Sequence, residues 1–155
     1  MSAYIIVALV AYLLGSISFS VIISKKMAGF YVREKGSGNA GATNMLRSVG
    51  KKGAIFTLIG DCLKGVVAIL FAIIVGKIAK NTDKALLVQL AGIAVVLGHT
   101  FPIFFGFKGG KGVATSLGVL LMTNWQIGLI CLVFALVLMA LSKMVSLGSV
   151  GAAIL

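Results

Sequence analysis

Glycine, amide, hydroxyl and basic side chains gather in one polar segment of an otherwise apolar chain. This segment, loop one, spans residues 33–47 and reads REKGSGNAGATNMLR. Its glycines allow main-chain N–H groups to approach a ligand closely, and an arginine can hold a phosphate through two parallel hydrogen bonds. Residues 42–47 are suited to begin a helix, whose N-terminus would favour an anion. The pattern predicts a phosphate-binding loop, and the alternative is a flexible loop whose charges only set membrane topology.

A second segment, loop three, repeats this chemistry over residues 106–115, GFKGGKGVAT. Three glycines surround Lys108 and Lys111. The segment is one residue too short for the nucleotide-binding pattern G-x-x-x-x-G-K-[ST], and Gly112 stands where that pattern needs Ser or Thr. Nucleotide hydrolysis is therefore not indicated, whereas phosphate binding is. Two such loops on one membrane face could bind two anionic groups.

Three ionisable residues lie within apolar runs. Asp61 and Lys64 are three positions apart and share a helical face, and His99 is the one histidine of the chain. Ionisable groups inside a membrane span usually face the protein interior. A structural ion pair that braces the bundle is the simpler interpretation of Asp61 and Lys64, and a packing or hydrogen-bonding role is the simpler one for His99. Direct proton transfer is the less favoured alternative.

The composition indicates an integral membrane protein. Of 155 residues 60% are hydrophobic and 11% are charged, and the net charge is +11. Soluble domains are typically about 45–50% apolar and 25% charged. The positive excess in such an apolar chain points to anionic lipids or anionic substrates and not to nucleic acid. Cys62 and Cys131 show no metal-binding spacing, so we expect no metal site and no cofactor.

The apolar runs predict an all-α, polytopic helical bundle. A crossing helix needs about 20 mostly apolar residues, and we expect five full spans and the start of a sixth. They are residues 4–23, 53–76, 85–107, 113–125, 127–142 and 145–155. Ten of the 14 lysines and arginines lie in the first, third and fifth connections, and three lie in the second. Because basic loops remain in the cytoplasm, we expect an external N-terminus and cytoplasmic loops one and three.

Several motifs occur together in a recognisable order. They are GSGNAGATN at residues 36–44 with Arg47 following, D-x-x-K-G at 61–65, GHTFPIFFGFKGGKGVAT at 98–115, and SLGS at 146–149. In this pattern the chain resembles the bacterial acyl-phosphate:glycerol-3-phosphate acyltransferases, the PlsY family, over almost its whole length.

The resemblance implies transfer of a fatty acyl group from acyl phosphate to the 1-hydroxyl of sn-glycerol 3-phosphate. The products are lysophosphatidic acid and phosphate, in phospholipid biosynthesis. It also implies a bacterial plasma (inner) membrane location, seven spans, an active site that faces the cytoplasm, and contact with the soluble enzyme that makes acyl phosphate. Family members continue through a further crossing to a motif with a His and an Asn. We therefore expect residues 1–155 to form a single acyltransferase domain that is incomplete at its C-terminus.

The resemblance also assigns roles to individual residues. The acyl phosphate would be held by Ser37, Gly38, Asn39, Gly41, Thr43 and Asn44. Glycerol 3-phosphate would be held by Arg47, Lys108, Gly109, Gly110, Lys111 and Ser146. Ser37, Arg47, Lys108 and Ser146 would be catalytic, and Asp61, Lys64 and His99 would support the site. Two alternatives remain open: a small membrane transporter for an anionic metabolite, and an inactive truncated homologue.

Overall fold

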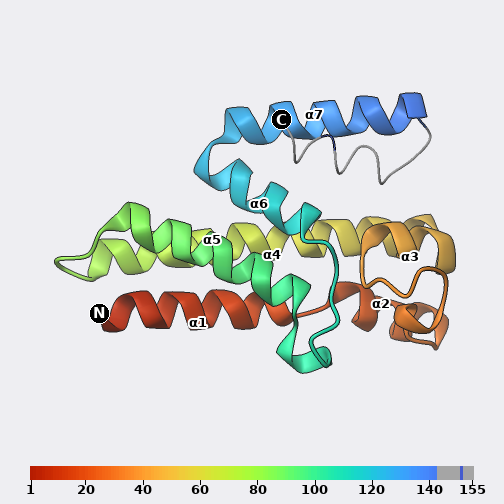
Figure 1. The fold of residues 1–155 in the computed structure, drawn as a ribbon, viewed down its shortest axis with the longest axis horizontal. Coiled ribbons are helices and arrows are strands. Elements are labelled where there is room, and N and C mark those ends of the chain that lie inside the picture. The colour runs from red at the N-terminus through yellow and green to blue at the C-terminus, as the bar shows by residue number, and fades with distance from the viewer. Residues whose placement is uncertain (143–150, 152–155) are drawn as a thin grey trace.

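The computed structural model describes residues 1–142 and 151, and all regular secondary structure in this part is helical (Figure 1). Two short 3-10 turns, η1 and η2, lie in the connections between the α-helices. In chain order the elements are α1 (Ser2–Ser16), α2 (Phe19–Ala28), η1 (Val32–Glu34), α3 (Ala42–Ser48), α4 (Lys51–Ile78), α5 (Lys84–Thr100), η2 (Ile103–Phe105), α6 (Val113–Thr123) and α7 (Trp125–Ser142).

Four helical segments of the described part are long and apolar enough to cross a membrane. They are Ser2–Ala28, Lys51–Ile78, Lys84–Phe105 and Trp125–Ser142. The span expected at residues 113–125 differs: α6 has 11 residues and covers about 17 Å, against roughly 30 Å of hydrocarbon. The sixth span, expected at 145–155, lies outside the described residues apart from Gly151.

The first predicted span is interrupted. The helix stops after Ser16, Ile17 and Ser18 are extended, and α2 begins at Phe19. A break inside an apolar segment leaves carbonyl groups that hydrocarbon cannot satisfy. Here Lys64 Nζ on α4 donates to the carbonyl oxygens of Gly15 and Ile17, at 3.0 Å each. The intramembrane lysine thus stabilises the break.

Small residues allow the helices to approach closely. A Cβ atom built on Gly15 of α1 would lie 2.1 Å from the carbonyl oxygen of Val95 on α5. One built on Gly118 of α6 would lie 2.1 Å from the carbonyl oxygen of Cys62 on α4. Backbones this close require glycine, as is common where membrane helices pack. The main core joins α1, α4 and α5 through Val7, Ala11, Ala68, Ile69, Ala72, Leu87, Ala91 and Val95.

Candidate active site

Loop one and loop three touch each other. Arg33 Nη1 donates a hydrogen bond to the carbonyl oxygen of Phe105, which directly precedes loop three. The guanidinium also lies 5.5 Å from the centre of the Phe105 ring, within the range of a cation–π contact. A Cβ atom built on Gly110 would lie 3.0 Å from the carbonyl oxygen of Ala40 in loop one. The structure therefore brings the two basic, glycine-rich segments together, away from the chain end at Met1 and the α4–α5 turn (Figure 1).

The Arg33 guanidinium has no carboxylate partner among the described residues, where the ion pairs all involve Asp61. Its Nε and Nη2 atoms are buried without a hydrogen-bond partner. Burial lowers the pKa of Arg33 from its ordinary value, and the group stays protonated because the pKa of an arginine is so high. The sequence shows this charge in loop one but gives no sign that it joins the two loops.

Loop one is built around the side chain of Asn44, which is 2% exposed. Its Nδ2 atom lies 2.9–3.0 Å from the carbonyl oxygens of Val32, Lys35 and Asn39 and donates to them. Its Oδ1 atom accepts from the backbone N–H of Ser37 at 3.1 Å. The amide expected to bind phosphate is therefore occupied by the backbone of the loop, and Asn44 shapes the site.

Two glycines of loop one have backbone conformations that fit no other residue well. Gly36 has φ +58° and Gly38 has φ +71°, in the left-handed region that glycine adopts readily. A Cβ atom built on Gly36 would lie 2.2 Å from Asn44 Oδ1. The chain can therefore wrap tightly around Asn44.

The predicted ligands differ in accessibility. Ser37, Gly38, Arg47, Lys108 and Lys111 are exposed, whereas Asn39, Gly41 and Thr43 are half-buried. Arg47 lies in the last turn of α3, the helix expected from residue 42. In loop three the backbone N–H of Gly109 donates to Thr100 and that of Gly110 donates to His99, at 3.0 and 3.1 Å. These two amides are therefore engaged, and the lysines are the available ligands there.

Asp61, Lys64 and His99 form one buried cluster beneath the loops. Lys64 Nζ lies 3.0 Å from Asp61 Oδ1 and 2.8 Å from His99 Nδ1. His99 Nδ1 is 3.5 Å from the same carboxylate oxygen, and the three residues are 2–6% exposed. The bracing ion pair of the sequence analysis is present. The proximity of Asp61 to His99 could not be predicted from the sequence, because the two residues are on different helices.

Residues 5–155 match the family model described as glycerol-3-phosphate acyltransferase. The enzyme of that name from Clostridioides difficile (strain 630) is 51% identical, over 96% of this chain and 72% of its own length. The one from Nostoc sp. (strain PCC 7120 / SAG 25.82 / UTEX 2576) is 48% identical, over 96% and 70%. The chain belongs to the glycerol-3-phosphate acyltransferase family.

Two solved structures of the family superpose on this chain. The glycerol 3-phosphate form of PlsY, an integral membrane glycerol 3-phosphate acyltransferase, has a TM-score of 0.86 at 42% identity, over 99% of this chain and 74% of its own. Its lysophosphatidic acid form has a TM-score of 0.83 at 40% identity, over 99% and 73%. The family predicted from the motifs is thus confirmed, and the chain is an acyltransferase by descent.

Within the family's fold, the predicted site divides into two layers. The exposed layer contains Ser37, Arg47, Lys108 and Lys111, and the buried layer contains Asn44, Asp61, Lys64 and His99. Ser146, assigned to glycerol 3-phosphate, lies outside the described residues.

Proposed function

We propose that this protein transfers a fatty acyl group from acyl phosphate to the 1-hydroxyl of sn-glycerol 3-phosphate. The observation that carries the proposal is the contact between loop one and loop three through Arg33 and Phe105. Both substrates end in a phosphate group, and two basic segments in contact can hold two such groups close together. The names of the relatives support the same reaction, and so do the glycerol 3-phosphate and lysophosphatidic acid forms in which PlsY has been solved.

The substrates divide between the loops according to the family resemblance. Ser37, with the backbone of Gly38 and the polar groups of Asn39, Gly41 and Thr43, would hold the phosphate of the donor. Arg47 and Lys108, both exposed, would hold glycerol 3-phosphate, with Lys111 and Ser146. Asn44 supports this arrangement from below, since its amide is bonded to the loop.

The chemistry needs little from protein side chains. The 1-hydroxyl oxygen forms a bond to the acyl carbonyl carbon, the bond from that carbon to the phosphate oxygen breaks, and phosphate leaves. The hydroxyl proton passes to the phosphate of glycerol 3-phosphate. Because the mixed anhydride is already reactive, holding hydroxyl and carbonyl together and stabilising developing negative charge with basic groups provide the catalysis.

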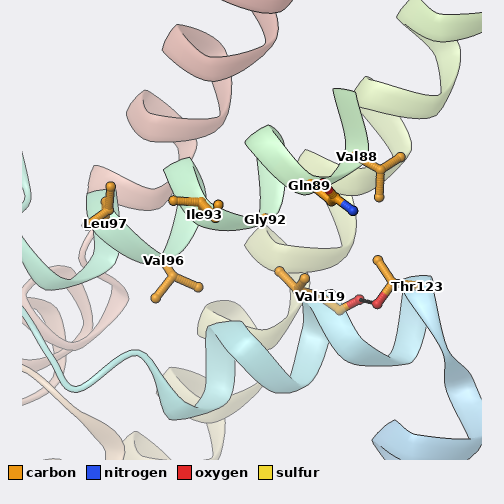
Figure 2. Close-up of a pocket in the computed structure, with 8 residues that line it drawn as sticks. All are labelled: Val88, Gln89, Gly92, Ile93, Val96, Leu97, Val119 and Thr123. Carbon is orange, nitrogen blue, oxygen red and sulfur yellow. Dashed lines mark hydrogen bonds between the residues drawn. The ribbon is translucent and has the colours of Figure 1, made fainter. Parts of the chain in front are cut away.

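An apolar groove offers a place for the acyl chain of the donor. It is an open groove of about 570 Å³ between α5 and α6. Figure 2 shows Val88, Gly92, Ile93 and Val96 on the α5 side and Val119 on the α6 side. Its inner end is beside loop three, because a Cβ atom built on Gly112 would lie 3.1 Å from a methyl group of Val96. A chain bound here would point its reactive end at the loops.

The membrane is the remaining partner. Large apolar side chains on the outer faces, such as Ile55, Ile59 and Leu63, are about half exposed, and lipid would cover them. We propose the bacterial plasma membrane, with loops one and three in the cytoplasm, where the soluble enzyme that makes acyl phosphate could deliver it.

The test is acyl transfer by the purified protein in lipid vesicles given palmitoyl phosphate and labelled glycerol 3-phosphate. We expect labelled lysophosphatidic acid and one phosphate released for each acyl group transferred. Uptake of label into the vesicles without lipid product would instead indicate the transporter. Absence of both, from protein shown to be folded by thermal unfolding, would indicate an inactive homologue.

A further inference from the structure

The orientation of His99 is fixed by its buried neighbours. His99 lies in the last turn of α5 and is 6% exposed. Its Nδ1 atom is 2.8 Å from Lys64 Nζ. Lys64 is anchored in turn by the carbonyl oxygens of Gly15 and Ile17 and by Asp61. The imidazole ring is therefore held by a side chain that is itself held at three points.

These contacts decide where the imidazole proton is. Lys64 Nζ makes hydrogen bonds to the carbonyl oxygens of Gly15 and Ile17 and to His99 Nδ1, and these three bonds use the three N–H donors of a lysine ammonium. His99 Nδ1 then accepts a hydrogen bond, and the ring proton lies on Nε2. His99 thus presents a fixed Nε2–H donor.

That donor faces the place where loop one and loop three meet. A Cβ atom built on Gly110 would lie 2.2 Å from His99 Nε2 and 3.0 Å from the carbonyl oxygen of Ala40. The Nε2 edge is therefore next to the segment that carries Lys108 and Lys111. Among the described residues no side chain or backbone group forms a hydrogen bond with Nε2, although Nδ1 is fully engaged.

We infer that His99 is a substrate-binding residue whose Nε2–H donates to a phosphate oxygen held between loop one and loop three. Lys64 and Asp61 are its positioning residues, since Lys64 Nζ contacts His99 Nδ1 and Asp61 contacts Lys64, and neither belongs to the loops. The inference rests on the proposed function for the source of the phosphate, which is either glycerol 3-phosphate or acyl phosphate.

Nitrogen NMR of the whole protein tests this directly, because the chain has one histidine. Protein labelled with ¹⁵N-histidine, purified without a histidine tag, reports on His99 alone. We expect the spectrum of the Nε2–H tautomer, and Lys64→Met should convert it to a mixture of tautomers. Glycerol 3-phosphate, palmitoyl phosphate and inorganic phosphate are then added separately. A shift of the Nε2 signal with one or both substrates supports the inference and identifies the source.

An Nδ1–H tautomer in the unmodified protein would overturn the inference, and so would an Nε2 signal that neither substrate moves. A response to inorganic phosphate alone would also overturn it, because the substrates would then bind elsewhere.

Substitution of His99 separates the donor from the ring. His99→Gln places an amide N–H near the position of Nε2, whereas His99→Asn places it near Nδ1, too short to reach the loops. We expect His99→Gln to keep kcat/KM within about 10-fold and His99→Asn to lose roughly 10²–10³-fold, the usual effect of removing one such donor. In His99→Asn, the KM for the substrate that moves the Nε2 signal should rise, and the KM for the other substrate should stay unchanged. Equal activity of the two variants would contradict the inference.

The two proposals can fail independently. If the unmodified protein forms no lysophosphatidic acid but its Nε2 signal responds to glycerol 3-phosphate, the proposed reaction fails and the phosphate-binding role of His99 stands. If the protein is active and the signal does not respond, only the role of His99 fails.

Discussion

The side-chain amide of Asn44 makes three hydrogen bonds to the backbone of loop one and a fourth to the carbonyl oxygen of Val32, just before the loop. Arg47, one turn further along α3, is exposed and in the described structure has no such bonds. Both residues belong to the motif that predicted the site, yet the structure gives them different tasks. One holds the loop in shape, and the other is available to a substrate.

Substitution distinguishes these tasks. Arg47→Ala should lower acyl transfer by about 10²–10³-fold, the effect expected when a group that stabilises developing charge is lost, and should leave the melting temperature unchanged. Asn44→Ala should lower both the rate of acyl transfer and the melting temperature, because each backbone group left buried without a partner costs about 1–3 kcal/mol. The measurements are the rate of labelled product formation and thermal unfolding in detergent. Near-normal turnover of the Arg47→Ala variant would contradict the assignment of Arg47 to the substrate site. An Asn44→Ala variant that is inactive but fully stable would show that Asn44 binds substrate and does not only hold the loop in shape.

At the scale of elements, helix packing determines where the site residues meet. Hydropathy predicted the positions of α4, α5 and α7 closely, since a crossing helix must be long and apolar. It did not predict the break at Ile17–Ser18, because that break depends on Lys64 reaching from another helix. Both glycine-rich loops could be recognised from the sequence. The proximity of Asp61 to His99 and the contact between Arg33 and Phe105 could not, because each joins segments that are far apart in the chain.

Two glycines on neighbouring helices predict opposite outcomes for a leucine substitution. Gly92 faces the groove, where a Cβ atom would be 3.1 Å from a methyl group of Val119, a side chain that can move. Gly92→Leu should fold and should shift the donor preference from palmitoyl phosphate towards shorter acyl phosphates. In Gly118→Leu a Cβ atom would meet the backbone of Cys62 at 2.1 Å, so α4 and α6 should separate and the yield of folded protein should fall.

The readouts are kcat/KM over a series of acyl phosphates and the yield after size-exclusion chromatography. Ala85→Leu, at an exposed position of α5 away from the groove, is the matched control. An unchanged chain-length profile in folded Gly92→Leu would place the acyl chain elsewhere.

At the scale of the whole molecule, the basic loops and the short α4–α5 turn lie towards different ends of the bundle (Figure 1). Helix α4 has 28 residues and is about 42 Å long, more than the roughly 30 Å of hydrocarbon. Its two ends therefore reach the two membrane surfaces. Lys35 lies in loop one, and Thr82 lies in the turn, where its hydroxyl caps the carbonyl of Ala79.

We expect the charge at each surface to set the orientation of the chain. The first and third connections together hold nine lysines and arginines and the second holds three, and short basic loops stay in the cytoplasm. A reporter that is active only outside the plasma membrane should therefore be inactive when fused after Lys35 and active when fused after Thr82, and a cytoplasmic reporter should give the reverse pattern. The paired fusions control for expression, because each reporter is compared at two sites of one chain. An external Lys35 would place loops one and three on the face away from the proposed cytoplasmic source of acyl phosphate, and would therefore contradict the proposed reaction.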